Sequence, residues 1–375
     1  MTKGSHKNIA VIGGFANSLY NFRGDFIRAL STAGWKVFAL APYMGPKDRE
    51  EISALDALPT EIFLKRNGLN PFDDIRSVFN LLKTFRKIKP DLIFSYTIKP
   101  VIWSSIVANF LNIRHISLIT GLGYTFNKRT GLKSVFRQLI VGLYKFALRS
   151  ASAVIFQNQS NLDLFLSEGI VTSQNSFLVK GSGINLSRYI YTELDTKQTK
   201  FLLIARLLID KGLQEYLEAA KVVKSRYPEA EFSIVGPEDN SPNAFDVKTV
   251  LQYQEEGLIE FLGWQDDVRP FLSECQIFVL PSYHEGMPRS VMEAMAMGRP
   301  VITTNVPGCK DTIDDQISGI LVPAKDSKAL AGAMIKMINT RNTWRKMGKA
   351  GREKAVLEFD VNNINTRLLE IIDEA

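Results

Sequence analysis

The sequence predicts an α/β protein made of two successive doubly wound domains, each with a parallel sheet covered by helices on both faces. Short apolar runs of strand length alternate with helix-length amphipathic segments along the chain. The alternation stops once, at a polar run over 192–200 that is typical of a linker, and then restarts. The length of 375 residues suits two domains that each bury a core.

The first half carries six apolar runs of strand length, separated by segments with helical periodicity. The expected strands are Asn8–Ile12, Val37–Leu40, Ile62–Leu64, Leu92–Ser95, His115–Leu118 and Ala153–Phe156. The expected helices are Tyr20–Ala33, Asp73–Ile88, Val101–Leu111, Leu132–Leu148 and Leu162–Leu166. This alternation predicts a parallel sheet, because parallel neighbours are joined by long crossover connections.

The second half repeats the pattern. Its expected strands are Phe201–Ala205, Phe232–Val235, Ile259–Leu262, Ile277–Leu280 and Val301–Thr303. The expected helices are Gly212–Tyr227 with Asp210 as N-cap, a helix from about Pro288 to Met297, and the charged segment Asn342–Ala375. Parallel sheets of this kind bind ligands outside the carboxyl ends of their strands, so the residues after each strand are the functional candidates.

Composition places the chain among ordinary globular proteins, with 45% apolar and 23% charged residues. Two Cys and three His exclude a disulfide framework and a zinc finger, and no Asp-x-Asp spacing is present for a metal site. We therefore expect neither a metal nor a cofactor. No apolar stretch is long enough to span a bilayer and no signal peptide is visible, so we expect a cytoplasmic protein.

The net charge of +7 is unevenly distributed. Residues 1–185 hold 23 Lys and Arg against 11 Asp and Glu, whereas residues 186–375 hold 23 against 28. No acidic residue lies between Asp91 and Asp163, although eight cations do. This one-sided field predicts an anionic partner for the first half, such as a membrane surface, phosphates or nucleic acid.

One group of candidates follows the expected strand Phe201–Ala205. Arg206 comes directly after it, and Lys211 lies in the first turn of the expected helix. The helix macrodipole disfavours a cation there by about 0.3–1 kcal/mol, so a polyanion between the two side chains would explain the pair. A nucleotide diphosphate fits that description. The alternative is a pair of solvated loop cations.

A second group follows the expected strand Ile277–Leu280. Glu285 lies in the loop before a helix whose first turn offers backbone N–H groups near Ser290, a second place for an anion. Glu293 lies one to two turns further on, so the two carboxylates are not a close pair. Taken alone, Glu293 is expected at the surface, whereas Glu285 is expected to reach into the ligand crevice.

Together these motifs resemble the retaining glycosyltransferases of family 4, which have the GT-B fold. The residues that carry the resemblance are Gly13-Gly14, Arg206 with Lys211, Gly236, the turn from Gly263 to Asp267, Glu285 with Glu293, and the segment from Gly319 to Pro323. Tyr20 to Arg23 and Thr120 to Gly123 are similar to the bacterial subgroup that extends undecaprenyl-diphosphate-linked sugars, N-acetylgalactosaminyltransferases among them.

The resemblance implies two facing Rossmann-like domains with a cleft between them. Residues 1–188 would form an acceptor domain that faces the membrane, and residues 189–358 would form the donor domain. A C-terminal helix over 359–375 would return to the first domain.

The resemblance also implies roles for single residues. Arg206 and Lys211 would bind the donor diphosphate, Glu293 the ribose, and Glu285 the transferred sugar. The catalytic candidates are thus Glu285, Arg206 and Lys211. The other donor-binding candidates are Gly13, Gly14, Gly236, Gln265, Gly286, Met287 and Ser290.

In the first half, Arg23, Thr120 and Gly121 would bind the acceptor diphosphate. The expected helix around 131–149 mixes cations with large apolar side chains, so it is either a membrane-binding amphipathic helix or a core helix with a solvated edge. The implied partners are a nucleotide sugar, most often UDP-linked, a polyprenyl-diphosphate saccharide, and the anionic cytoplasmic face of the inner membrane. The product would be an O-antigen, capsule or glycoprotein glycan.

Other functions stay open. A nucleotide-sugar epimerase shares this fold, and a transferase could use GDP-mannose or a non-lipid acceptor. A nucleic-acid-binding protein is disfavoured, because the cations are spread over several elements with no interleaved aromatic platform.

Overall fold

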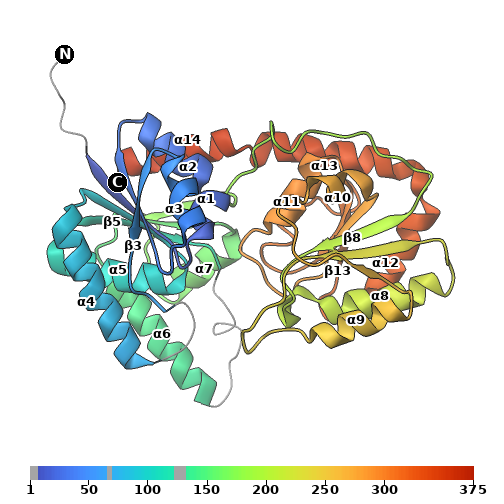
Figure 1. Ribbon diagram of the computed structural model, residues 1–375, viewed down its shortest axis with the longest axis horizontal. Helices are drawn as coiled ribbons and strands as arrows, with labels where there is room; N and C mark the ends of the chain where they lie inside the picture. Colours follow the sequence, from blue (N-terminus) through green and yellow to red (C-terminus); the bar gives the residue numbers. More distant parts are fainter. Residues whose placement is uncertain (1–6, 66–69, 122–131) are drawn as a thin grey trace. The chain divides into compact units, whose positions relative to one another are not determined.

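The computed structural model describes residues 7–65, 70–121 and 132–375, with no side chains described for 132–136 (Figure 1). The chain divides into two compact units. Unit 1 comprises Met1–Ser182 with Val361–Ala375, and unit 2 comprises Gly183–Asp360. Residues 183–188, which the sequence assigns to the first domain, thus lie in unit 2. The backbone N–H of Ile184 donates to the carbonyl of Phe359 at 2.7 Å, which ties this segment to the end of that unit.

Unit 1 contains a seven-stranded sheet in the order β3-β2-β1-β4-β5-β6-β7, and every neighbouring pair is parallel. The strands are β1 (Asn8–Ile12), β2 (Lys36–Ala41), β3 (Ala57–Glu61), β4 (Leu92–Tyr96), β5 (Arg114–Ile119), β6 (Ala153–Phe156) and β7 (Ser176–Leu178). The described helices are α1 (Asn17–Asn21), α2 (Gly24–Thr32), α3 (Pro46–Ser53), α4 (Pro71–Ile88), α5 (Ile98–Leu111), α6 (Leu132–Leu148), α7 (Gln159–Ser167) and α14 (Val361–Glu374).

Helices cover both faces of this sheet. Helix α5 packs between α4 and α6, while α14 packs against α2 (Figure 1). Ile364, Leu368 and Ile371 of α14 are buried in the same core as the strands β1 and β4. The last helix therefore completes the core of unit 1, although the chain passes through unit 2 to reach it.

Three expectations for unit 1 were wrong. The strand expected over Ile62–Leu64 lies at 57–61 instead, where Pro59 is tolerated because β3 is an edge strand. Ile62 and Leu64 are buried core residues just beyond that strand. The helix expected over Tyr20–Ala33 is two helices, because Arg23 leaves the helical conformation with φ −125° and ψ 4°. Helix α3 and strand β7 were not expected at all.

Unit 2 contains a six-stranded parallel sheet in the order β10-β9-β8-β11-β12-β13. Its strands are β8 (Lys200–Ile204), β9 (Glu231–Val235), β10 (Glu260–Phe261), β11 (Ile277–Leu280), β12 (Val301–Thr304) and β13 (Gly319–Val322). Its helices are α8 (Leu213–Lys224), α9 (Val247–Glu255), α10 (Arg269–Glu274), α11 (Arg289–Ala296), α12 (Ser327–Asn339) and α13 (Trp344–Glu358), with 3-10 turns at Ile209–Lys211 and Arg341–Thr343.

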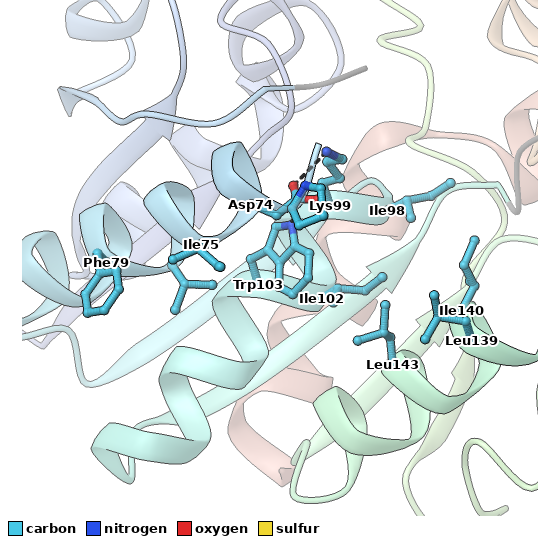
Figure 2. A pocket seen from close by; sticks show the side chains of 12 residues that line it. Asp74, Ile75, Phe79, Ile98, Lys99, Ile102, Trp103, Leu139, Ile140 and Leu143 are labelled. Carbon is cyan, nitrogen blue, oxygen red and sulfur yellow. Dashed lines mark hydrogen bonds and ion pairs between the residues drawn. The ribbon is translucent and has the colours of Figure 1, made fainter. Parts of the chain in front are cut away.

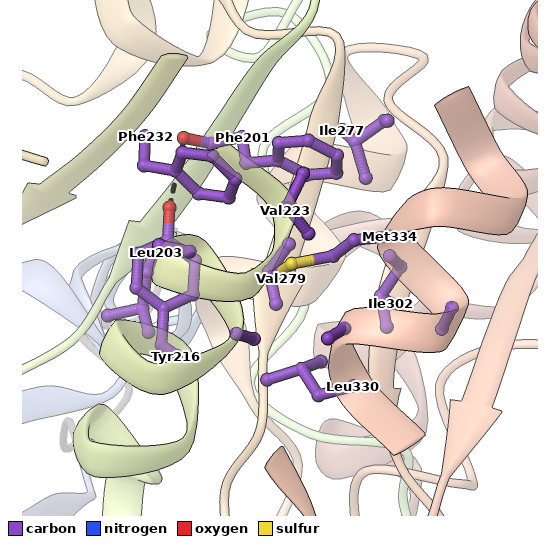
Figure 3. Close-up of a cluster of buried hydrophobic side chains, with 14 of the residues drawn as sticks. Phe201, Leu203, Tyr216, Val223, Phe232, Ile277, Val279, Ile302, Leu330 and Met334 are labelled. Atoms are coloured by element: carbon purple, nitrogen blue, oxygen red, sulfur yellow. Dashed lines mark hydrogen bonds between the residues drawn. The ribbon is translucent and has the colours of Figure 1, made fainter. Parts of the chain in front are cut away.

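The core of unit 2 lies between its sheet and the helices α8 and α12 (Figure 3). The rings of Phe201 and Phe232 stack with their centroids 4.9 Å apart. Tyr216 of α8 is fully buried, and its hydroxyl donates to the carbonyl of Phe201 at 3.0 Å. This core anchors α8 to β8 and β9, and so fixes the loops that follow those strands.

Each sheet has one point at which the direction of winding reverses. In unit 1 this switch point lies between β1 and β4, and in unit 2 it lies between β8 and β11. Doubly wound sheets bind ligands at the switch point, outside the carboxyl ends of the strands. The sequence motifs Gly13-Gly14, Arg206 and Glu285 follow β1, β8 and β11, and so lie at these two places.

Candidate active-site residues

Lys211 and Glu285 meet at the switch point of unit 2. The Lys211 Nζ lies 2.5 Å from Oε1 of Glu285, and the Ser282 hydroxyl donates to the same oxygen at 2.8 Å. Both charged side chains are partly buried, with exposed fractions of 22% and 13%. The structure thus brings together two residues that lie 74 positions apart in the sequence.

The loop that carries Lys211 differs from the sequence prediction. Asp210 is not the N-cap of α8, because residues 209–211 form a 3-10 turn and Gly212 occupies the N-cap position with φ +72°. A Cβ at Gly212 would lie 2.1 Å from the Pro281 carbonyl oxygen, so only glycine fits there. The Asp210 carbonyl accepts from the Tyr283 N–H at 2.8 Å, which fastens this loop to the one that carries Glu285.

Arg206 forms an ion pair that the sequence did not indicate. Its Nη1 lies 2.7 Å from Oδ2 of Asp239, in the loop after β9. Burial alone would raise the pKa of Asp239, but hydrogen bonds from Ser241 and the Arg206 guanidinium outweigh it and hold the pKa below its usual value. Asp239 is therefore a carboxylate at neutral pH, and it is the anion that Arg206 pairs with in this structure.

Glu293 is buried, which contradicts the expectation that it lies at the surface. It is 7% exposed and lies in the part of α11, residues 291–296, that is buried throughout. The Arg289 Nε donates to its Oε1 at 2.8 Å. Burial is the main cause that raises the pKa of Tyr189, and the charge of Glu293 and its hydrogen bond to Tyr189 raise it further. The Tyr189 hydroxyl therefore stays protonated beside the carboxylate. Glu285 and Glu293 have different partners, as expected for two carboxylates that do not form a pair.

Glu285 leads directly into α11. Gly286 and Met287 are buried, Pro288 is the N-cap, and Ser290 is half-buried in the first turn. A Cβ at Gly308 would lie 2.4 Å from the Glu285 carbonyl oxygen, so the loop after β12 packs closely against the backbone of Glu285. The side chain of Thr304 also bonds to the Ser282 carbonyl. The position of Glu285 is thus fixed by neighbours on two sides.

Gly236 and Gln265 lie at the carboxyl ends of β9 and β10. A Cβ at Gly236 would approach the Ala205 carbonyl oxygen to 1.8 Å, and the residue has φ +149°. Its N–H donates to the carbonyl of Gly263 at 2.8 Å, while the Gln265 side chain donates to Leu262 at 2.7 Å. The side chain of Gln265 thus braces its own loop.

At the switch point of unit 1, the two glycines pack against residues that follow β4. A Cβ at Gly13 would lie 2.4 Å from the Tyr96 hydroxyl oxygen, and one at Gly14 would lie 2.9 Å from Oγ1 of Thr97. Packing within the unit therefore accounts for both glycines. The expected approach of these glycines to donor phosphates stays a prediction.

Thr97 itself has two unusual features. It adopts φ +70° and ψ 156°, a conformation that β-branched residues rarely occupy, and its Oγ1 is buried with no partner among the described residues. Strain of this kind persists only where the surroundings enforce it, and it is common at ligand sites. The sequence alone did not indicate this residue.

Arg23 is the N-cap of α2 and is 3% exposed, so it is not a solvated surface cation. Its guanidinium carbon lies 5.4 Å from the centre of the Tyr96 ring. Burial raises the pKa of Tyr96 to about 12, although the Ser18 hydrogen bond and the Arg23 charge oppose this. Thr120 and Gly121 follow β5 and are half-buried, while the rest of their expected loop, residues 122 and 123, lies outside the described residues.

Helix α6 has a buried face and an exposed apolar face. Val141, Tyr144 and Leu148 belong to the core, whereas Leu139 and Phe146 are 59% and 49% exposed. The interpretation of this segment as a core helix is therefore correct for one of its faces only. Residues 128–131 and the side chain of Phe136 lie outside the description.

Two histidines lie in the described part of the chain, His115, which is buried, and His284, which is half-buried. His115 is 1% exposed in β5, and burial lowers its pKa. Burial likewise lowers the pKa of His284, which neighbours Glu285. Within residues 7–65, 70–121 and 132–375, no three His, Cys, Asp or Glu side chains gather as a metal site requires.

Comparison with known families decides the class of this protein. The family described as Glycosyl transferases group 1 matches residues 198–340, and the family Glycosyl transferase 4-like matches residues 12–158. The chain is a glycosyltransferase. The first match contains Arg206, Lys211 and Glu285, and the second contains Gly13 and Gly14.

Two relatives extend over most of the glycosyltransferase. The N,N'-diacetylbacillosaminyl-diphospho-undecaprenol alpha-1,3-N-acetylgalactosaminyltransferase of Campylobacter jejuni is 29% identical over 370 residues, which cover 95% of this chain and 96% of the relative. The UDP-Gal:alpha-D-GlcNAc-diphosphoundecaprenol alpha-1,3-galactosyltransferase of Escherichia coli is 24% identical and covers 77% of this chain and 76% of its own.

Solved structures show that the fold is GT-B. Sucrose-phosphate synthase from Thermosynechococcus elongatus matches with a TM-score of 0.79 at 20% identity, covering 98% of this chain and 99% of that chain. Anabaena HepE in complex with UDP matches with a TM-score of 0.79 at 16% identity, covering 98% and 100%. Within the described residues, no helix has the length and hydrophobicity needed to cross a membrane.

Proposed function

We propose that this glycosyltransferase moves a hexose or N-acetylhexosamine from a nucleotide sugar to a polyprenyl-diphosphate-linked saccharide, with retention of configuration, in the synthesis of a bacterial surface glycan. The observation that carries the proposal is the placement of Arg206, Lys211 and Glu285 in the loops after β8 and β11, the two strands that border the switch point of unit 2. Two relatives with diphospho-undecaprenol acceptors in their names support the lipid acceptor. A UDP-linked donor is supported by one of those names and by the UDP complex of HepE.

In this proposal, unit 2 binds the donor. Arg206 and Lys211 bind the diphosphate, Glu293 accepts hydrogen bonds from the ribose, and Glu285 holds hydroxyls of the transferred sugar. Backbone around Gly236 and Gln265 borders the base. Gly286, Met287 and Ser290 would form the sugar and phosphate side of the site at the start of α11, where backbone N–H groups favour an anion.

The proposed reaction is an attack on the face of the sugar from which the diphosphate leaves. The bond between the anomeric carbon and the acceptor hydroxyl oxygen forms as the bond to the β-phosphate oxygen breaks, and the departing phosphate takes the hydroxyl proton. Negative charge then builds on the diphosphate, where Arg206 and Lys211 stabilise it electrostatically. The proposal requires no metal or other cofactor.

Unit 1 binds the acceptor in this proposal. Arg23, Thr120 and Gly121 contact the acceptor diphosphate at the carboxyl edge of the first sheet. The exposed apolar side chains of α6 and the acid-free segment between Asp91 and Asp163 suit an anionic bilayer surface. We therefore place the enzyme at the cytoplasmic face of the inner membrane as a peripheral protein.

A panel of UDP-, GDP- and ADP-sugars tests the donor, with the melting temperature as the readout. The sugar that raises the melting temperature most, expected to be UDP-linked, is then incubated with a polyprenyl-diphosphate saccharide. Transfer with release of nucleoside diphosphate, and an α-linkage from an α-donor by NMR, are the expected results. An altered sugar without transfer would instead identify an epimerase, and flotation with anionic liposomes checks the membrane contact.

A further inference from the structure

An apolar groove of about 560 Å³ lies between α4, α5 and α6 of unit 1 (Figure 2). Its volume falls within the range of small-molecule sites. Ten of its twelve lining residues are apolar. The apolar lining includes Ile75 and Phe79 from α4, Ile102 and Trp103 from α5, and Leu139 and Leu143 from α6. No candidate residue for the donor or the acceptor diphosphate belongs to this lining.

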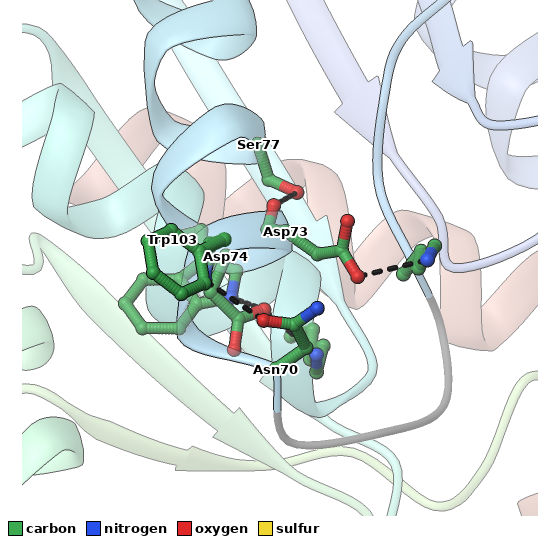
Figure 4. Close-up of polar contacts among 8 residues, drawn as sticks. Asn70, Asp73, Asp74, Ser77 and Trp103 are labelled. Atoms are coloured by element: carbon green, nitrogen blue, oxygen red, sulfur yellow. Dashed lines mark hydrogen bonds and ion pairs between the residues drawn. The ribbon is translucent and has the colours of Figure 1, made fainter.

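The two charged residues of the lining bind each other. Lys99 Nζ lies 2.7 Å from Oδ1 of Asp74, and the indole N–H of Trp103 donates to the same oxygen at 3.2 Å (Figure 4). The groove therefore offers few uncommitted polar groups for a sugar or a peptide backbone, whose polar groups would lose water without gaining partners. A hydrocarbon carries no such cost.

The α4 wall of the groove is held in place at its start. Asn70 caps the helix by accepting from the Phe72 N–H at 3.1 Å, and Lys65 pairs with Asp73 at 2.8 Å. The Ser77 hydroxyl donates to the Asp73 carbonyl at 2.7 Å (Figure 4). These contacts fix the first turns of the α4 wall, and a wall that is already ordered lowers the entropic cost of binding.

The groove begins beside the switch point of unit 1. Helix α5 starts at Ile98, directly after the strained Thr97 that lies against Gly14. Ile98 and Trp103 both line the groove, and five residues of helix span roughly 7.5 Å. A ligand whose diphosphate lies beside Arg23 and Thr120, at this edge of the sheet, can therefore extend an apolar tail along α5 into the groove.

Exposed apolar side chains and cations surround the groove on the same helices. Phe72, Phe110 and Phe146 are 81%, 71% and 49% exposed and do not belong to the lining. Helices α5 and α6 contain no acidic residue, while Lys145 and Arg149 are exposed at the end of α6. An apolar surface with a positive border is typical of a site that meets lipids with anionic headgroups.

We propose that this groove binds the isoprenoid units nearest the diphosphate of the lipid acceptor. This inference rests on the proposed function, because it assigns the tail of the same acceptor whose head lies at the switch point. Each methylene moved from water into the groove favours binding by about four-fold. The groove thereby selects lipid-linked acceptors over the same saccharide on a short carrier.

A kinetic comparison of two acceptors tests the proposal. Both carry the same saccharide on a diphosphate, one attached to undecaprenol and one to a methyl group, in detergent micelles. The double variant Ile75→Gln, Leu139→Gln alters side chains that are 54% and 59% exposed, so the fold is expected to persist. It should raise KM for the undecaprenyl acceptor by about ten-fold and leave KM for the methyl acceptor and the donor hydrolysis rate within two-fold.

Phe110→Gln is the matched control, since Phe110 is an exposed apolar residue of α5 outside the lining. It should leave both KM values unchanged. The proposal is overturned if the groove variant and wild type show the same ratio of the two KM values. It is also overturned if Phe110→Gln raises the KM for the undecaprenyl acceptor as much as the groove variant does. The exposed apolar side chains of α4, α5 and α6 would then only insert into the micelle.

Tryptophan fluorescence provides a second readout that does not depend on transfer. Farnesyl diphosphate should change the emission in a saturable way, inorganic diphosphate should not, and Trp103→Phe should remove the change. Ile75→Gln with Leu139→Gln should weaken this binding by about ten-fold. Binding of farnesyl diphosphate without any transfer by the wild type would refute the proposed function and leave the groove assignment standing. Absence of the fluorescence change refutes the groove assignment itself.

Discussion

The switch point of unit 2 is built from charged pairs, whereas that of unit 1 is built around an aromatic ring. In unit 2, Lys211 pairs with Glu285 and Arg206 pairs with Asp239. In unit 1, Tyr96 fills the space beside Gly13, and the buried Arg23 lies near its ring. The same topology thus supports two different kinds of surface.

The difference teaches how each edge would receive an anion. In unit 2 each cation already has a carboxylate partner, so a diphosphate must replace or join these partners, and binding is an exchange of ion pairs. Further hydrogen bonds fix both carboxylates, from Ser282 to Glu285 and from Ser241 to Asp239. Their partners Lys211 and Arg206 are therefore held in place before the ligand arrives. In unit 1, burial and packing hold Arg23 in place instead. Substitutions there should therefore change the stability of the unit as well as its charge.

The largest expected effect is the loss of either cation of unit 2. Arg206→Ala and Lys211→Ala should each lower kcat by about 10²–10³-fold, because each removes a charge from the developing negative charge of the leaving diphosphate. Initial rates of nucleoside diphosphate release measure the effect. Lys221→Ala, which alters a 63% exposed lysine of α8, is the control and should keep normal activity. Near-normal turnover in either site variant would contradict the phosphate assignment.

A glycine of unit 2 should have the next largest effect. Gly236→Ala forces a Cβ to within 1.8 Å of a backbone oxygen at a φ of +149°, so it should destabilise unit 2 by roughly 3 kcal/mol or more. Gly257→Ala is the matched control, because Gly257 also has a positive φ but its Cβ would meet nothing within 4 Å. It should cost only about 1–2 kcal/mol. Thermal unfolding followed by circular dichroism compares the two, and equal losses would show that the close approach to Ala205 is unimportant.

The sequence predicted the cations at the switch points but not their partners, and the reason is physical. Arg206 comes directly after the expected strand and Lys211 follows at the start of the next expected helix, so the alternation of strands and helices alone places both at the sheet edge. Asp239 is 33 residues from Arg206 and follows a different strand, so only the order of strands brings it near. Burial was equally hidden, since Glu293 looks like an ordinary helix residue until α11 packs.

The fold shows the same limit. Strands β6 and β11 and helix α6 were predicted to the residue, because each is an apolar segment with clear ends. Strand β3 was misplaced because its sequence, Ala57–Glu61, has only one large apolar residue, Leu58, and contains a proline. The groove between α4, α5 and α6 could not be predicted, because it depends on how three helices pack side by side.

A smaller effect is expected when the partner of Arg206 is removed. Asp239→Asn keeps the shape of the side chain but abolishes its charge. The donor diphosphate then no longer has to displace a carboxylate from Arg206. The donor KM should fall by about two- to five-fold with kcat little changed, a size typical of exposed ion pairs. Titration of donor hydrolysis measures it, and Asp246→Asn, at the N-cap of α9, serves as a control. A rise in KM would show instead that Asp239 orients Arg206 for the donor.

The smallest effect concerns one histidine in each unit, the buried His115 of unit 1 and the half-buried His284 of unit 2. Burial lowers the pKa of both His115 and His284 from 6.5, so the unfolded chain takes up protons at a higher pH than the folded chain. Stability is therefore complete above pH 6.5 and falls as the pH drops from 6.5 towards the folded-state pKa. His284→Gln should make the melting temperature of unit 2 less sensitive to pH within that window, while the contribution of His115 to unit 1 remains. Melting curves between pH 5 and 8 measure this difference, and an unchanged pH profile would mean that His284 is protonated alike in both states.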